Sequence, residues 1–110
     1  MPDEKTDLLQ GTLDLLILTA LRREPCHGFG LSQRLRELSR GVFQVEMGSR
    51  YPALCRLEAR GWIRGEWNVS EANRRARYYS LTAAGRRQLA VETAEWARLS
   101  GTINLMLKTT

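Results

Sequence analysis

The chain has 110 residues, of which 43% are hydrophobic and 26% are charged. This length is typical of one globular domain with a single core, and it is too short for a barrel or a doubly wound sheet. Lysine and arginine number 17 against 12 aspartate and glutamate residues, so the formal net charge is +5.

Hydrophobic residues at helical spacing predict a first helix over residues 8–21. The apolar stripe is wide enough to be buried on more than one side. Two starts remain open for this helix. Asp7 with Gln10 has the pattern of a capping box, whereas Gly11 followed by Thr12 would begin the helix later.

A turn and a second helix follow. Residues 23–28 contain a proline and a glycine, which are typical of turns, and residues 29–39 repeat leucine on one face. Gly41 stands where a helix terminator belongs. Two helices joined by a short turn form the first half of a helix-turn-helix unit, and the β-prone residues 42–45 predict a minor strand.

Residues 50–60 predict a third helix, which ends at Gly61. Ser49 is a favourable N-cap, and Pro52 lies in the first turn, where its missing N–H group is not needed. Leucines occupy one side of this helix and arginines are expected on another. The pattern therefore predicts a basic outer face made by Arg50, Arg56 and Arg60.

An antiparallel hairpin is predicted next. Residues 62–67 and 76–81 are rich in aromatic residues and alternate roughly as strands do, and the polar residues 68–75 between them read as a long turn. Three arginines cluster at this turn. They are Arg74, Arg75 and Arg77.

Thr82 is the expected N-cap of a last helix over residues 83–107. This helix is too long to be covered by a core of this size. Its hydrophobic residues repeat with the spacing of a coiled-coil seam, which Glu92 and Gly101 interrupt, and a homodimer is the simplest way to cover them. The predicted dimer residues are Leu89, Trp96, Leu99, Ile103 and Met106.

The positive charge is confined to the middle of the chain. Residues 1–40 and residues 91–110 each carry equal numbers of basic and acidic side chains, whereas residues 41–90 carry nine against four. All nine are arginine, whose guanidinium group binds phosphate oxygens and base edges with fixed geometry. This distribution predicts a surface that binds a polyanion.

The sequence contains few candidate catalytic residues or metal ligands and no candidate membrane-spanning segment. His27 is the single histidine, and neither a nucleophile triad nor a phosphate-binding glycine loop is visible, so an enzyme is not expected. Cys26 and Cys55 are interpreted as free, buried thiols rather than metal ligands. The longest apolar run, residues 15–18, cannot span a bilayer, and a cytoplasmic protein without cofactors is expected.

Three helices followed by a two-stranded hairpin is the order of a winged helix. The expected fold class is mainly α with a small β-hairpin, in which residues 1–82 form a winged-helix DNA-binding domain and residues 83–110 form a dimerisation helix. In such a module the third helix enters the major groove and the wing lies along phosphates or a minor groove.

The sequence resembles the PadR-type transcriptional regulators over about residues 8–90. The resemblance is carried by motifs that occur in order and at the family's spacing: residues 9–18, the His-Gly motif at 27–31, the segments 48–54, 56–58 and 61–63, and residues 74–85. Two positions depart from the family pattern. Phe29 replaces the usual tyrosine and keeps a packing role, and Arg50 adds a charge at the start of the third helix.

The resemblance implies a homodimeric bacterial transcription factor, usually a repressor, on a pseudo-palindromic operator in double-stranded DNA. It also implies the compact subgroup with one C-terminal helix, in which some members bind small aromatic molecules between the subunits. Trp96 is then either a dimer contact or part of an effector site. The alternative function is a winged-helix protein-interaction module with an acidic partner.

The DNA-binding residues expected from the arginine distribution and the resemblance belong to the third helix and the wing. Tyr51 contacts DNA through its hydroxyl or packs its ring under the helix. The wing arginines are expected to bind phosphates without reading sequence. The full set is Ser49, Arg50, Tyr51, Arg56, Arg74, Arg75 and Arg77.

Overall fold

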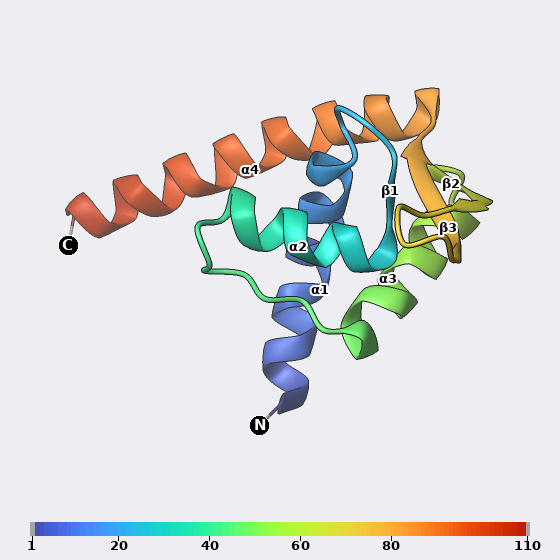
Figure 1. The fold of residues 1–110 in the computed structure, drawn as a ribbon. Helices are drawn as coiled ribbons and strands as arrows, with labels where there is room; N and C mark the ends of the chain where they lie inside the picture. Colours follow the sequence, from blue (N-terminus) through green and yellow to red (C-terminus); the bar gives the residue numbers. More distant parts are fainter. Residues whose placement is uncertain (1, 110) are drawn as a thin grey trace.

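The computed structural model describes the backbone of residues 2–109 and the side chains of residues 11–109. The described chain is mostly helical with a small antiparallel sheet and a long last helix, as the predicted fold class requires (Figure 1). The side chains of Asp7 and Gln10, and the apolar ones before residue 11, lie outside the described residues. The elements are α1 (Pro2–Ala20), β1 (Cys26–His27), α2 (Gly28–Leu38), α3 (Met47–Ala59), β2 (Ile63–Val69), β3 (Arg75–Leu81) and α4 (Ala83–Thr109).

Strand β1, which was not predicted, lies within residues 23–28, where the sequence predicts a turn. The sheet order is β1-β3-β2, and Cys26 and His27 pair with Tyr79 and Tyr78 of β3. His27 has an extended backbone because it is the N-cap of α2, and its Nδ1 accepts a hydrogen bond from the Gly30 N–H group at 3.0 Å. The same extended conformation lets the segment pair with β3.

The strand predicted over residues 42–45 is wrong. This segment is irregular and crosses from α2 to α3, and the Ser32 hydroxyl donates a hydrogen bond to the Val45 carbonyl at 3.0 Å. With no neighbouring strand to pair with, β propensity alone does not make a strand here.

Helix α3 begins earlier than predicted. Its N-cap is Glu46, and Ser49 lies inside the first turn, where its N–H group donates to the Glu46 carbonyl at 3.0 Å. The predicted N-cap role of Ser49 is therefore wrong. The predicted end is confirmed, because Gly61 has a φ of +76° and its N–H group donates to the Glu58 carbonyl at 3.0 Å.

The wing consists of β2, β3 and the turn at residues 70–74. Both strands are longer than predicted, and the turn is shorter, because the Ser70 N–H group donates to the Arg74 carbonyl at 2.8 Å. The register places Trp67 opposite Arg77 and Val69 opposite Arg75. These four side chains therefore lie on one face of the hairpin.

The core lies between α1, α2, α3, the base of the sheet and the first turns of α4. Leu89 of α4 is 6% exposed and belongs to this core. Its predicted place in the dimer seam is wrong, because the core of the single chain already buries it. The largest fully buried side chains are Ile17, Leu18, Leu21, Leu31, Leu57 and Ile63.

The two cysteines lie in different surroundings. Cys26 is buried, and burial raises the pKa of its thiol, although nearby Arg34 opposes this effect. Cys55 is exposed on α3, so the expectation that both thiols are buried is wrong for Cys55. Phe29 is 66% exposed, so it does not pack in the core of the single chain.

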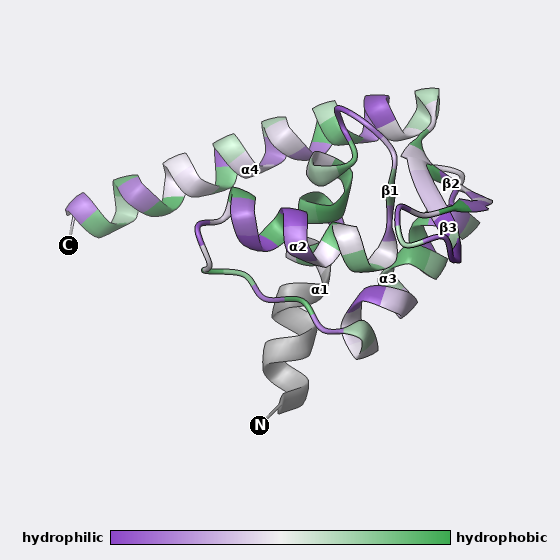
Figure 2. Ribbon diagram, viewed as in Figure 1, coloured by the Kyte–Doolittle hydropathy of each residue, from purple (hydrophilic) through white to green (hydrophobic). Residues whose placement is uncertain are grey.

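The last helix extends beyond the rest of the molecule. Thr82 caps it as predicted, and the Thr82 hydroxyl accepts a hydrogen bond from the Gly85 N–H group at 3.0 Å. Figure 1 shows that α4 runs from the wing to a C-terminus far from the other elements, and Figure 2 shows hydrophobic residues along this protruding part. Within residues 2–109, none of the helices combines the length and hydropathy needed to cross a membrane.

Candidate nucleic-acid interface

The exposed stripe of α3 is uncharged. Its side chains are small apart from Tyr51 and Met47 in the first turn, which is 67% exposed. Tyr51 is 60% exposed, so its ring does not pack under the helix. The basic outer face predicted from Arg50, Arg56 and Arg60 is wrong for the first two, because Arg50 bends toward α2 and Arg56 toward α1. Arg60, the C-cap of the helix, is exposed as predicted, with its guanidinium 5.1 Å from the centre of the Trp62 ring. The stripe is formed by Gly48, Tyr51, Pro52, Cys55 and Ala59.

Arg50 leans against α2. Its Nη1 donates a hydrogen bond to the Ser32 hydroxyl at 2.8 Å, and its Nε would lie 3.1 Å from a Cβ atom added at Gly28. The side chain is half-buried at the edge of the interface. Arg50 therefore lies on the side of α3 that faces α2.

Arg56 points away from the exposed stripe and toward α1. Its Nη2 lies 2.7 Å from Oδ1 of Asp14, a carboxylate that is itself buried. A buried carboxylate needs a cationic partner, because leaving its charge uncompensated is strongly destabilising. The structure thus corrects the prediction for Arg56, which joins α3 to α1 instead of lining the interface.

The wing supplies the accessible positive charge next to α3. Arg74 and Arg75 are exposed at its end, and the Arg75 guanidinium lies 4.9 Å from the centre of the Trp67 ring. A guanidinium over an indole face is stabilised electrostatically and held in place. Trp67 was not among the residues predicted for the site. It lies four residues after Ile63, so both side chains are on the same face of β2.

Arg77 is only partly exposed and is held by α3. Its Nη2 donates to Glu58 Oε2 at 2.5 Å, and the guanidinium lies 6.0 Å from the centre of the Tyr79 ring. Burial raises the pKa of the Tyr79 hydroxyl, while Arg77 lowers it. The role predicted for Arg77, a phosphate contact at the wing tip, does not fit this position.

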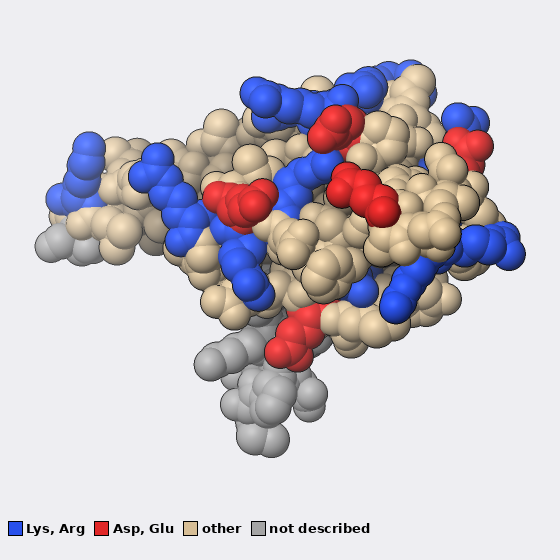
Figure 3. All heavy atoms as spheres, in the orientation of Figure 1, with Lys and Arg blue, Asp and Glu red and all other residues tan. Residues whose placement is uncertain are grey.

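Basic side chains are not gathered into one patch on the face that Figure 3 shows. They lie over the wing, over α2, near the beginning of α4 and toward its far end, with acidic side chains between them. The arrangement that favours nucleic acid is therefore local. It joins the small-residue stripe of α3 to the arginines of the neighbouring wing, a surface that we call the α3–wing face: Tyr51, Cys55, Trp67, Arg74 and Arg75. Ser49 is exposed in the first turn of α3, on the side that faces α1.

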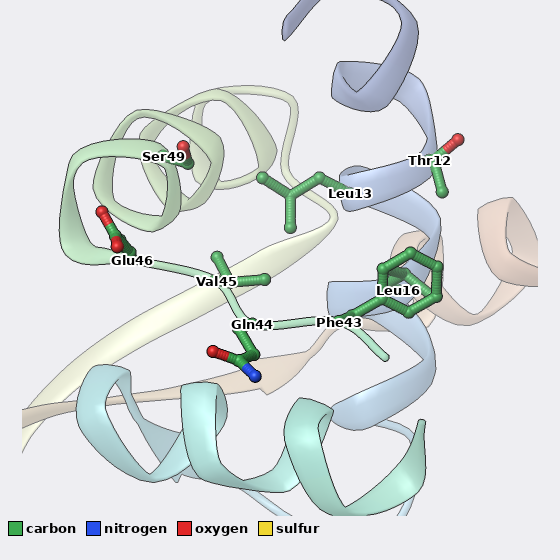
Figure 4. A pocket seen from close by; sticks show the side chains of 8 residues that line it. All are labelled: Thr12, Leu13, Leu16, Phe43, Gln44, Val45, Glu46 and Ser49. Atoms are coloured by element: carbon green, nitrogen blue, oxygen red, sulfur yellow. The ribbon is translucent and has the colours of Figure 1, made fainter. Parts of the chain in front are cut away.

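A small pocket lies beside the first turn of α3. It has a volume of about 260 Å³ between α1, the irregular segment and α3. Figure 4 shows Leu13 of α1 and Val45 pointing toward each other, with Phe43 beside Leu16. The pocket therefore lies between α1 and the beginning of α3, and its apolar lining comes from Leu13, Leu16, Phe43 and Val45.

A second hollow, of about 380 Å³, lies between α1 and the exposed part of α4. Trp96 and Leu99 line it on the α4 side, together with Glu92 and with Glu95, whose pKa is lowered by a hydrogen bond from Arg98. Trp96 is 53% exposed. Among the described residues, no cluster of three or more His, Cys, Asp and Glu side chains could hold a metal ion.

Comparison with known sequences places the chain in a family. The family model described as "Transcriptional regulator PadR-like family" matches residues 17–91. An uncharacterized protein of Lysinibacillus sphaericus is 28% identical over 105 residues, 94% of this chain and 95% of its own length. A transcriptional regulator of Mycobacterium tuberculosis is 44% identical over 63 residues, 57% of this chain and 55% of its own length.

Solved structures agree with this placement. A PadR-family transcriptional regulator from Eggerthella lenta has a TM-score of 0.79 at 30% identity, over 99% of this chain and 93% of that one. A PadR-like transcriptional regulator from Bacillus cereus has a TM-score of 0.78 at 31% identity, over 92% and 96%. Members of this family are transcriptional regulators rather than enzymes. With its winged-helix elements in order and the family model matched over most of its length, this chain belongs to the PadR-like family of transcriptional regulators.

Proposed function

We propose that this protein is a sequence-specific DNA-binding regulator that acts as a homodimeric repressor on a pseudo-palindromic operator. The observation that carries the proposal is the α3–wing face, in which a helix with small exposed side chains lies beside a hairpin that ends in two exposed arginines. Such a regulator works in the cytoplasm, where its operator is.

The shape of α3 suits a major groove. Gly48, Pro52 and Ala59 are small, so the helix backbone can approach base edges closely, and Tyr51 and Ser49 supply hydroxyl groups that can donate or accept hydrogen bonds. The N-terminus of α3 also carries the positive end of the helix dipole, which favours a phosphate.

The wing and α4 complete this arrangement. Arg74 and Arg75 are placed to contact phosphates beside the groove, and residues 83–110 form the dimerisation helix next to the DNA-binding unit of residues 1–82. The exposed hydrophobic side chains of α4 support this division: Trp96, Leu99, Ile103 and Met106. A dimer would present two DNA-binding units, one for each half-site of the operator.

The affinity of the protein for the DNA upstream of its own gene will fall steeply with salt, because each phosphate contact releases counterions. We expect a log–log slope of about −0.9 per contact, and Arg75→Ala will reduce this slope while weakening all DNA sequences about equally. Tyr51→Phe removes only the hydroxyl and will instead alter base preference by roughly 1 to 3 kcal/mol. Gel shifts over a salt series measure the slope, and gel shifts with base-substituted DNA measure the change in base preference.

Wild-type binding that is absent, or indifferent to salt, would contradict this function. Capture of an acidic protein in a pull-down, without DNA binding, would then favour the alternative of a protein-interaction module. The Arg64→Ala variant is the control for Arg75→Ala, because Arg64 is an exposed arginine of the wing that points to the opposite face.

An aromatic effector is a further part of this proposal. The hollow beside Trp96 supports it, because an exposed indole at the edge of a hollow can stack on a planar molecule. Planar aromatic compounds are expected to quench the fluorescence of wild-type protein more than that of Trp96→Leu, and to lower DNA affinity in parallel. Equal quenching of both proteins across a varied set of compounds would count against the effector.

A further inference from the structure

Glu58 of α3 contacts both strands of the wing. Its Oε2 accepts hydrogen bonds from the Gly65 N–H group of β2 at 3.3 Å and from Arg77 Nη2 of β3 at 2.5 Å. The Glu58 and Arg77 side chains are about one-third exposed, at 33% and 37%. One carboxylate therefore ties the helix to the hairpin at a partly shielded position.

Arg77 occupies space that only a glycine leaves free. A Cβ atom at Gly65 would collide with the Arg77 Nε and would lie 3.0 Å from its Cζ. Among the described residues, this Nε is the one buried side-chain nitrogen or oxygen without a hydrogen-bond partner. The guanidinium is thus confined between β2 and Glu58, with the Tyr79 ring on β3 beside it.

The confined guanidinium lies on the same face of the wing as Trp67 and Arg75. Arg77 lies opposite Trp67 in the register, and Trp67 carries Arg75 over its ring. Side chains directly opposite each other on one face of an antiparallel pair interact, so a shift of Arg77 acts on Trp67 and, through the Trp67 ring, on Arg75. The position of Arg75 therefore depends on how Arg77 is held.

We propose that Glu58 is a positioning residue for DNA binding, which acts through Arg77 to set the wing against α3. This inference rests on the proposed function. It assigns Arg77 to the joint between helix and wing, so that α3 and Arg75 reach the same stretch of DNA at once. No group of this joint needs to touch DNA itself.

The sign of the charge change separates positioning from simple electrostatics. Glu58→Gln removes a negative charge, which by itself strengthens attraction to DNA. Loss of positioning has the opposite effect, and we expect affinity to fall about tenfold, with a smaller salt slope because wing contacts are lost. Glu66→Gln is the matched control, since Glu66 is an exposed glutamate of β2 outside the joint, and its affinity should be unchanged or higher.

A second arm tests whether the effect passes through the wing. In a background with Arg74→Ala and Arg75→Ala, Glu58→Gln should produce little further loss of DNA affinity, while its effect on thermal stability should remain. A purely structural role for Glu58 would give the same tenfold loss in both backgrounds. That result, or a Glu58→Gln variant that binds DNA as well as wild type does, would overturn the proposal.

The geometry can be measured without DNA. Cys55 is exposed on α3 and Cys26 is buried, so spin labels on Cys55 and on an Ala72→Cys variant at the wing tip report one helix-to-wing distance when labelled protein is diluted with unlabelled protein. Glu58→Gln should broaden the distance distribution, and Glu66→Gln should not. An unchanged distribution in Glu58→Gln would refute positioning, whereas failure of wild type to bind any DNA would refute the proposed function instead.

Discussion

The Leu99→Asp variant will be a monomer and will lose about 100-fold or more in affinity for its operator. Leu99 is 49% exposed on the part of α4 that extends beyond the core, between Trp96 and Ile103, which are 53% and 45% exposed. A charge in the middle of an apolar seam must be desolvated if the helices pair. A monomer then binds each half-site independently and loses the gain that comes from linking two sites.

Sedimentation equilibrium and gel shifts with the full operator measure the two parts of this prediction. Ala94→Asp is the matched control, because it places the same charge on the opposite side of α4 at an exposed position. This variant should remain dimeric and bind DNA nearly as wild type does. A dimeric Leu99→Asp protein would show that the seam is not the dimer contact.

The Gly85→Ala variant will be destabilised by about 3 kcal/mol or more. A Cβ atom at Gly85 would run into the carbonyl oxygen of Trp62 and would lie 2.9 Å from its carbonyl carbon. These are backbone atoms, and the Thr82 N–H group donates to the same carbonyl at 3.1 Å, so neither side can move without breaking the contact between α4 and the turn after α3.

Urea denaturation of the two glycine variants of α4 tests this explanation. Gly101 has no atom within 4 Å of its would-be Cβ, so Gly101→Ala should stabilise the helix by about 0.5 to 1 kcal/mol through helix propensity alone. A Gly85→Ala variant as stable as wild type would mean that α4 does not pack closely against Trp62.

The order of the elements was determined by local sequence. Helical periodicity, the glycine after α3 and the Thr82 cap each act through neighbouring residues, so the three helices, the hairpin and the long last helix could all be predicted. The boundaries were not determined by local sequence alone, because Glu46 and not Ser49 is the N-cap of α3. Strand β1 was missed, since a two-residue strand exists only through its pairing with β3.

The directions of the arginines were decided by the tertiary structure. Arg56 binds Asp14 across 42 positions of sequence, and Arg77 binds Glu58 across 19, and no periodic pattern contains such pairs. Leu89 fitted the seam by spacing, yet it is buried because α1 lies against the first turns of α4. The sequence by itself determined that a basic winged helix forms with an exposed last helix. Only packing decided which guanidinium groups stay free, because Asp14 and Glu58 each bind an arginine that lies far away in the sequence.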